Sequence, residues 1–196
     1  RALIRTPRQW AALALFLAAL VLMPLVAGPR LIAVANIMLI SAIVVVGLQI
    51  CNGYAGQVNL GQAAFMGVGA YTAALLAAHT GMSFLLVIPL SGVSAAAFGF
   101  VFGLSAARIK GFYLALTTIA AQFIFHFAVL NLPSKWLGGS NGATVPPATL
   151  FGYKISTDVG LYFLCLAATV LMVAGAFGIV RSRFGRAFVA VRDYDV

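Results

Sequence analysis

Charged side chains are scarce in this chain, and acidic ones are almost absent. Only 8% of the residues are charged, three are Asp or Glu, and 63% are hydrophobic. Soluble globular domains carry about a quarter charged residues, so this composition argues against a soluble protein. The formal net charge is +9, but the basic residues stand in short clusters between apolar runs, which argues against a nucleic-acid partner. We expect an integral membrane protein whose surroundings are the lipid bilayer.

No acidic residue falls within an apolar run. The three acids are Asp158, Asp193 and Asp195. Proton- or ion-coupled carriers commonly keep an ionisable group at membrane depth, where it is costly and tends to mark function. The titratable candidate at depth is His126, which shares one helical face with Thr118 and Gln122 at i, i+4 and i+8 spacing. This stripe could line a route for a polar solute, or its side chains could hydrogen-bond to neighbouring helices.

Nucleotide-binding and catalytic motifs are also missing. The chain has no Walker A sequence, so we do not expect it to bind or hydrolyse ATP through a P-loop. It has no HExxH motif and no paired carboxylates in the apolar runs, which argues against an enzyme, a metal site and a cofactor. Cys51 and Cys165 fall at different depths, so we expect separate thiols that pack as small hydrophobes. ATP-driven transport would need a partner.

Six apolar runs are long enough to cross a membrane, whose hydrocarbon core of about 30 Å takes about 20 helical residues. The runs are 10–28, 31–50, 62–79, 83–105, 111–130 and 160–180. Pro24 and Pro89 lie inside two of them, and neighbouring groups in a membrane protein can satisfy the carbonyls that a proline frees. The sequence therefore predicts an all-α integral membrane protein with about six transmembrane helices in a single domain, 1–196.

Basic residues predict the orientation of these helices, because short cytoplasmic loops carry the excess of Lys and Arg. With a cytoplasmic N-terminus, nine basic residues lie on the cytoplasmic side, and Arg30, Lys135 and Lys154 lie outside. The nine are Arg1, Arg5, Arg8, Arg108, Lys110, Arg181, Arg183, Arg186 and Arg192. A cleavable signal peptide is an alternative for the first run. The apolar region of a signal peptide is only about 7–15 residues long, however, and this run is longer.

The segment 52–74 interrupts the apolar sequence with glycines and amides. In lipid, such residues persist where protein or a water-filled cavity surrounds them, so we expect this segment to line a pathway or to pack tightly. Small residues at four-residue spacing let helices approach closely. The residues expected to pack are Gly67, Gly69, Ala73, Gly99 and Gly103. Packing accounts less well for Gln57, Asn59 and Gln62, whose amides need polar partners or interfacial water.

The stretch 131–159 is too polar and too rich in Gly and Pro to be a span, and by the charge rule it is an external loop. Within it, Gly138-Gly139-Ser140-Asn141-Gly142 predicts a tight turn, and Pro146-Pro147 predicts an extended exit from that turn. A plain surface turn is enough to account for this composition.

Four motifs, spread over nearly the whole chain from about 40 to 193, carry a family resemblance. They are Gly53-Tyr54-Ala55-Gly56-Gln57 with Gly67-Val68-Gly69-Ala70-Tyr71; Ile109-Lys110-Gly111-Phe112-Tyr113-Leu114-Ala115 with Thr117-Thr118; Gly138-Gly139-Ser140-Asn141-Gly142-Ala143-Thr144; and Ser182-Arg183-Phe184-Gly185-Arg186-Ala187. In this order and spacing, the chain resembles the M-type membrane subunits of the ATP-binding-cassette importers for branched-chain amino acids. The H-type subunits of those importers generally lack the third motif.

The resemblance implies a multi-pass permease subunit that translocates branched-chain amino acids across the bacterial inner (plasma) membrane. It implies a heterodimer with a homologous permease subunit, two cytoplasmic ATP-binding subunits that supply the work, and a periplasmic substrate-binding protein that delivers the amino acid. The residues on the approach to the ATPase dock would be Arg181, Arg183, Arg186 and Arg192. The candidate residues of the translocation pathway are Tyr54, Gln57, Asn59, Gln62, Tyr71, Thr118 and Gln122.

Three alternatives stay open at this point. Related permeases for urea and short-chain amides share the same motifs, which leaves the substrate undecided. An ion-coupled secondary transporter could hold sodium through backbone carbonyls and hydroxyls, and a membrane scaffold would need only the packing glycines. The sequence begins at Arg1 and stops at Val196, before the coupling element of the family. We therefore expect it to be incomplete at the C-terminus and leave the N-terminus open.

Overall fold

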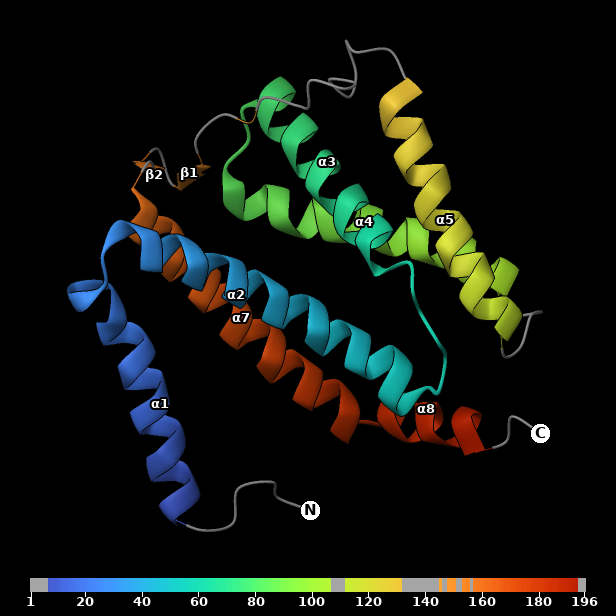
Figure 1. The fold of residues 1–196 in the computed structure, drawn as a ribbon, viewed down its shortest axis with the longest axis horizontal. Helices are drawn as coiled ribbons and strands as arrows, with labels where there is room; N and C mark the ends of the chain where they lie inside the picture. Colours follow the sequence, from blue (N-terminus) through green and yellow to red (C-terminus); the bar gives the residue numbers. More distant parts are fainter. Residues whose placement is uncertain are drawn as a thin grey trace.

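Long helices dominate the chain. The computed structural model describes residues 7–106, 112–131, 145, 148–150, 153–155 and 157–193. The helices are α1 (Pro7–Val26), α2 (Pro29–Leu48), α3 (Gln62–Thr80), α4 (Phe84–Ala106), α5 (Phe112–Asn131), α7 (Asp158–Arg181) and α8 (Arg183–Asp193). Figure 1 shows their arrangement, with a short strand pair beside the start of α7.

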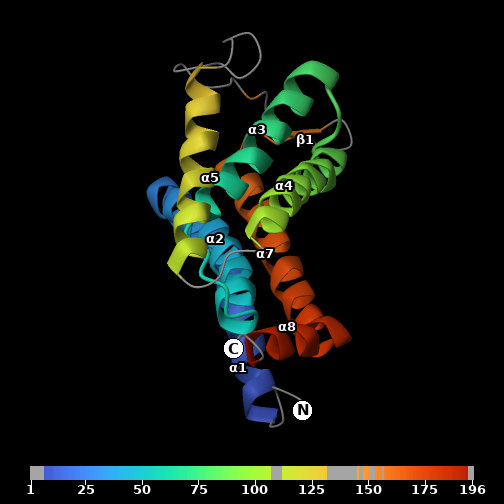
Figure 2. The same cartoon turned by 90° about the vertical axis from the view of Figure 1, so that its right-hand side faces the viewer.

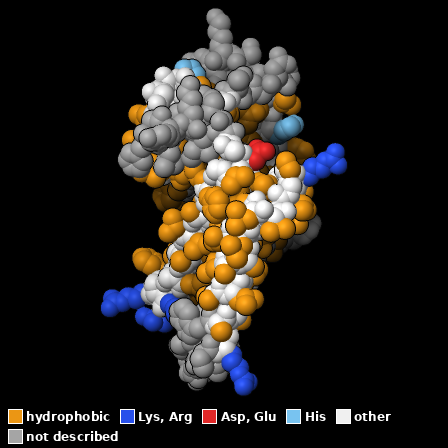
Figure 3. All heavy atoms as spheres, turned by 90° about the vertical axis from the view of Figure 1, so that its left-hand side faces the viewer, with side chains coloured by type: hydrophobic (Ala, Val, Ile, Leu, Met, Phe, Trp, Pro, Cys, Tyr) orange, Lys and Arg blue, Asp and Glu red, His pale blue; other side chains and the backbone are white. Residues whose placement is uncertain are grey.

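Five of these helical segments are long and apolar enough to cross a membrane. They are Pro29–Tyr54, Gln62–Thr80, Phe84–Leu104, Tyr113–Asn131 and Asp158–Arg181. The apolar part of α1, Ala11–Val26, is shorter. Figure 3 shows hydrophobic side chains across the middle of one face, with Lys and Arg side chains at its margins, mostly toward the lower end. The structure confirms an all-α integral membrane protein with roughly six helices.

The stretch 131–159, for which the sequence predicted only a loop, contains a small antiparallel hairpin. Strand β1 (Ala148–Leu150) pairs with β2 (Tyr153–Ile155). Thr149 stands opposite Lys154 in the register. The predicted turn at 138–142 lies outside the described residues, as do Pro146 and Pro147.

Helices α2 and α7 run parallel and form the first of two helix groups (Figure 1). The buried residues that hold them together are Ile32, Ala35, Leu39, Tyr162 and Leu166. Their spacing places three of them on one face of α2 and two on one face of α7, as amphipathic packing requires. One turn beyond Leu166, the buried Thr169 donates its hydroxyl to the Leu39 carbonyl at 3.2 Å. A hydrogen bond therefore extends the apolar contact between the two helices.

Tyr162 also attaches α1 to this group. Pro24 lies inside α1, and because proline has no N–H, the carbonyl of Leu20 loses its usual helical donor. The Tyr162 hydroxyl donates to that carbonyl at 2.8 Å, and its side chain is 1% exposed. A neighbouring helix thus satisfies a carbonyl that Pro24 frees, as expected for a proline in a membrane helix.

Replacing Tyr162 with phenylalanine is expected to lower the free energy of unfolding by about 1–3 kcal/mol, because the Leu20 carbonyl would lose its donor in a setting without water. Thermal unfolding of the detergent-solubilised protein measures this loss. In a Pro24→Ala background the helix supplies its own N–H, so the same substitution should cost clearly less. Equal costs in the two backgrounds would contradict the role given to this hydrogen bond.

Helices α3, α4 and α5 form the second group (Figure 2). Antiparallel α3 and α4 meet through the rings of Phe65 and Phe98, whose centroids are 5.7 Å apart in an edge-on arrangement. One polar bond joins the same pair of helices, because the Ser94 hydroxyl donates to the Thr72 hydroxyl at 2.9 Å. Helix α5 packs along α3, so a three-helix layer stands beside the α2–α7 pair.

The glycine- and amide-rich segment joins the two groups. At its C-terminal end α2 continues into a π-helical segment, η1 (Gln49–Tyr54). Residues 55–61 then connect η1 to α3 and form neither helix nor strand. Segments of π-helix are rare and are often found at functional sites. Gly56 has a φ of +69°, a left-handed conformation that favours glycine. We call residues 49–61 the joining segment.

Candidate functional site

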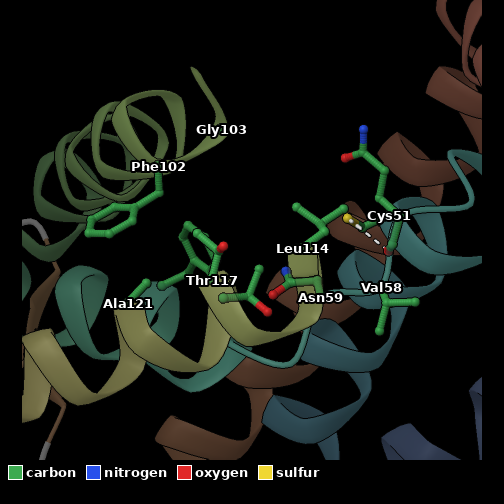
Figure 4. Close-up of a pocket in the computed structure, with 12 residues that line it drawn as sticks. Cys51, Val58, Asn59, Phe102, Gly103, Leu114, Thr117 and Ala121 are labelled. Atoms are coloured by element: carbon green, nitrogen blue, oxygen red, sulfur yellow. Dashed lines mark hydrogen bonds between the residues drawn. The ribbon is translucent and has the colours of Figure 1, made fainter. Parts of the chain in front are cut away.

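A pocket of about 160 Å³ lies between the joining segment, α4 and α5. Its lining residues are Cys51, Gln57, Val58, Asn59, Phe65, Gly99, Phe102, Gly103, Leu114, Thr117, Thr118 and Ala121. Figure 4 shows Leu114, Thr117 and Ala121 along α5, with Phe102 on one side and Cys51 on the other. A buried water needs only about 10–15 Å³ of such space, so the pocket has room for a small solute.

Asn59 is the most extensively bonded amide in this wall. Its side-chain nitrogen donates to the Gln62 side-chain oxygen at 3.2 Å, and its own Oδ1 accepts the Gly61 N–H at 2.9 Å. The Asn59 N–H donates to Oδ1 of Asn52 at 3.0 Å. These bonds give the amides partners within the protein, which a setting poor in water requires, and they hold the joining segment in one shape.

Thr118 fastens the joining segment to α5. Its hydroxyl accepts the Leu60 N–H at 3.1 Å and donates to the Ala115 carbonyl at 2.8 Å. The neighbouring Gly61 is buried, and a Cβ there would overlap the Thr118 carbonyl. The backbone of the joining segment therefore lies directly on the backbone of α5, an approach that only a residue without a side chain allows.

Cys51 belongs to the pocket, although the sequence predicted only a small packing residue at this position. The half-buried thiol donates to the Gln57 carbonyl at 3.8 Å (Figure 4), and the Gln57 N–H donates to the Cys51 carbonyl at 3.2 Å. Sequence reasoning also missed Thr117 and the aromatic wall of Phe65 and Phe102. The motif Thr117-Thr118 was an available signal for Thr117, whereas nothing in the sequence placed the two rings beside the joining segment.

Three of the seven candidate pathway residues line the pocket: Gln57, Asn59 and Thr118. A fourth, Gln62, stands behind the wall as a partner of Asn59. The other three do not line the pocket. Tyr54 is half-buried at the end of η1, Tyr71 meets the ring of Phe125 edge-on at 6.0 Å, and Gln122 is exposed.

The small residues of α3 face the neighbouring helices to different degrees. A Cβ at Gly67 would overlap the ring of Phe125 on α5. A Cβ at Gly69 would stand 3.9 Å from the Ala95 Cβ on α4, which is ordinary contact. Ala73 is half-buried one turn further along α3. Of the two glycines in α3, Gly67 is therefore the one that a side chain would disturb more.

The two glycines of the GxxxG motif in α4 have different surroundings. A Cβ at Gly99 would stand 3.2 Å from the Phe65 ring, tighter than most such contacts. At Gly103, nothing described lies within 4 Å of that position, and the residue borders the pocket. Gly99 thus permits close packing of α3 and α4, whereas Gly103 leaves space open.

Exposed arginines surround the end of α7 and the start of α8. Arg181, Arg183 and Arg186 are exposed to solvent. Arg192, at the far end of α8, donates from Nη1 to the Gly53 carbonyl at 3.3 Å. The basic residues therefore gather at the end of the molecule that carries the joining segment.

Comparison with known proteins identifies the family. A family model described as "Branched-chain amino acid transport system / permease component" matches residues 30–194. The chain belongs to this family. The match includes the joining segment and every lining residue of the pocket. It also confirms the resemblance that the motifs carry, although 138–144 and 109–111 lie outside the described residues.

Two curated relatives have names that agree with this description. Both are the high-affinity branched-chain amino acid transport system permease protein LivM, from Escherichia coli (strain K12) and Salmonella typhimurium (strain LT2). Each is 32% identical to this chain over 93% of the chain and 49% of the relative. The chain therefore spans about half the length of the curated relatives it matches. No solved structure matches it.

Family membership and the five apolar helical segments together identify a multi-pass inner-membrane protein, as the sequence predicted. The family is one of transporter components, so its members are not classed as enzymes. Among the described residues, no group of three or more His, Cys, Asp or Glu side chains could hold a metal ion.

Proposed function

We propose that the chain is a membrane-spanning permease subunit of an ATP-binding-cassette importer that moves branched-chain amino acids across the bacterial inner membrane. The observation that carries this proposal is the match of residues 30–194 to the permease family. Similarity to the two LivM proteins supports the choice of substrate class. The mixture of apolar and polar residues that line the pocket also supports this substrate class.

The wall of the pocket suits a small amino acid with an aliphatic side chain. Phe65, Phe102 and Leu114 offer apolar surface, while Asn59 and Thr118 offer amide and hydroxyl groups. Binding sites for small molecules commonly combine mostly apolar walls with a few placed polar groups. Urea and short amides would leave much of this apolar surface without a partner, so the pocket favours branched-chain amino acids over them.

The proposed partners follow from the family and from what the sequence lacks. Without a Walker A motif, the chain needs two cytoplasmic ATP-binding subunits to supply energy, and it would pair with a homologous permease subunit as a heterodimer. A periplasmic substrate-binding protein would deliver the solute. The exposed Arg181, Arg183 and Arg186 lie on the approach to the ATPase dock in this proposal. ATP would act by shifting the permease between two conformations.

Competition for uptake tests the substrate. Vesicles would contain the full-length protein with its partner permease, the ATP-binding subunits and the binding protein, and radiolabelled leucine would be the transported solute. We expect excess isoleucine or valine to suppress leucine uptake about tenfold or more, and urea or acetamide to leave it unchanged. Suppression by urea or acetamide, with none by isoleucine, would contradict the proposed substrate and favour an amide permease.

A further inference from the structure

We propose that Arg192 is a positioning residue through which the cytoplasmic helix α8 holds the wall of the pocket. This inference rests on the proposed function, because it treats the pocket as part of the solute's path. The residue lies at the end of α8, and its side chain reaches back to the joining segment, where Nη1 donates to the Gly53 carbonyl at 3.3 Å.

The direction of α8 is set by a tight connection to α7. Ser182 alone separates the two helices, and its hydroxyl accepts the Phe184 N–H at 3.1 Å while donating to the Ile179 carbonyl at 2.6 Å. The buried Gly185 lies so close to α7 that a Cβ would overlap the Val180 carbonyl. Helix α8 therefore leaves α7 at a defined angle and carries Arg192 to the joining segment.

Two independent contacts place Arg192 on this segment. The first is the hydrogen bond to Gly53, whose carbonyl belongs to the last turn of η1. Carbonyls at the end of a helical segment lack helical donors, and a cationic donor suits them well. The second contact is steric. The aliphatic part of the Arg192 side chain packs against Gly56 so closely that a Cβ at Gly56 would lie 2.6 Å from the Arg192 Cγ. The left-handed conformation of Gly56 and the absence of a side chain there both serve this contact.

The segment that Arg192 holds is the segment that lines the pocket. Cys51, Gln57, Val58 and Asn59 belong to it and form one wall. The bond from the Asn59 N–H to Asn52 closes the segment on itself. A contiguous chain of contacts therefore leads from α8 through the Gly53 carbonyl to the pocket wall, and coupling between two places requires such a physical connection.

The contact of Arg192 with the joining segment controls whether the pocket can open. With Arg192 in place, the wall that carries Cys51 stays against α5, whereas loss of the contact frees the wall to move. Since α8 also carries the exposed Arg183 and Arg186, a partner that moves α8 would move the wall. Arg192 is the point at which such a movement reaches the pocket.

Labelling of Cys51 measures the position of the wall. The full-length protein, assembled with its partners in vesicles and without ATP, would be treated with N-ethylmaleimide. Mass spectrometry would follow the peptides of Cys51 and of Cys165, which serves as an internal reference in the α2–α7 group. We expect Arg192→Gln to raise the labelling rate of Cys51 relative to Cys165 by about fivefold or more, as for the loss of one hydrogen bond from a charged donor.

Three further variants make the result specific. Arg30→Gln removes the same charge from the start of α2, away from α8 and the joining segment, and should leave Cys51 labelling unchanged. Arg192→Lys keeps a cationic donor and should keep the rate within about twofold of the native rate. Gly56→Ala should raise the rate on its own, and the double variant Gly56→Ala/Arg192→Gln should exceed neither single variant, because both disturb one contact.

The inference is overturned if Arg192→Gln labels like Arg30→Gln, if Arg192→Lys fails to restore the native rate, or if the two single effects add. Should Arg192→Gln fail to assemble, Gly56→Ala and Arg192→Lys carry the same test. Labelling needs no transported solute, so failure of leucine uptake in the native protein would defeat the proposed function alone. Unchanged Cys51 labelling in Arg192→Gln, together with leucine uptake by the native complex, would defeat only the role of Arg192.

Discussion

Leucine uptake by the assembled transporter is expected to fall by about tenfold or more when Gly103 is replaced by leucine, without loss of stability. Gly103 borders the pocket, and nothing described lies within 4 Å of the place where its Cβ would stand. The Cβ of a leucine therefore fits at this position without a clash. The rest of the side chain would extend into the pocket and obstruct a solute there. Leucine also favours the helix over glycine by about 1 kcal/mol.

Gly92→Leu is the matched control for this prediction. Gly92 lies on the same helix, α4, and a Cβ there would also meet nothing described within 4 Å, but the residue does not border the pocket. Uptake by this variant should stay close to the native rate. If both variants transport leucine at the native rate while the complex is intact, the pocket is not on the solute's path.

The second large effect is expected at Gly61, where alanine should lower the free energy of unfolding by about 1–3 kcal/mol. The φ of −94° at Gly61 is open to any residue, so the cost is not one of backbone strain. It arises because the new Cβ would overlap the Thr118 carbonyl, which belongs to backbone and cannot turn away. The joining segment would have to leave α5, and the Leu60–Thr118 hydrogen bond would break. Uptake should fall with it.

Thermal unfolding of the purified protein measures this effect, with Gly175→Ala as the control. Gly175 lies in α7, and a Cβ there would meet nothing described within 4 Å. Alanine in that helix should stabilise by about 0.5–1 kcal/mol, as it usually does in place of a helical glycine. Native-like stability in Gly61→Ala would show that the joining segment does not rest on α5 as described.

The helices were predictable from the sequence because the membrane imposes a strong rule on it. A span needs about 20 apolar residues, and each long helix of the structure occupies one of the six apolar runs. The membrane also requires that each backbone carbonyl has a donor within the protein. Pro24 leaves the Leu20 carbonyl without its helical donor, and the Tyr162 hydroxyl supplies one, a neighbouring group of the kind that the sequence predicted. The hairpin of β1 and β2 was not predictable in this way, because three-residue strands in a polar stretch have no periodicity to reveal them.

The candidate site was predictable only in part. Amides in an apolar chain indicated the joining segment, and Gln57, Asn59 and Thr118 do line the pocket. Helical spacing placed Gln122 and His126 on one stripe with Thr118, yet both are exposed in the structure. Periodicity shows which residues share a face, but it does not show what that face meets.

The glycines illustrate the same limit. Gly99 and Gly103 form one motif in the sequence, and small residues at that spacing usually indicate close helix contact. Among the residues that the structure describes, Gly99 has a neighbouring side chain near the position of a Cβ, the ring of Phe65, and Gly103 has none and borders the pocket. The difference depends on where α4 crosses α3, which is a property of tertiary packing and not of the motif.

The most direct test of the central claim is the energy source of leucine uptake. Vesicles containing the full-length protein, its partner permease and the ATP-binding subunits would be loaded with ATP or a non-hydrolysable analogue, with and without the binding protein outside. The account predicts uptake that requires both hydrolysable ATP and the binding protein and that persists when proton and sodium gradients are collapsed. Uptake that follows an ion gradient and proceeds without ATP would contradict it and identify a secondary transporter.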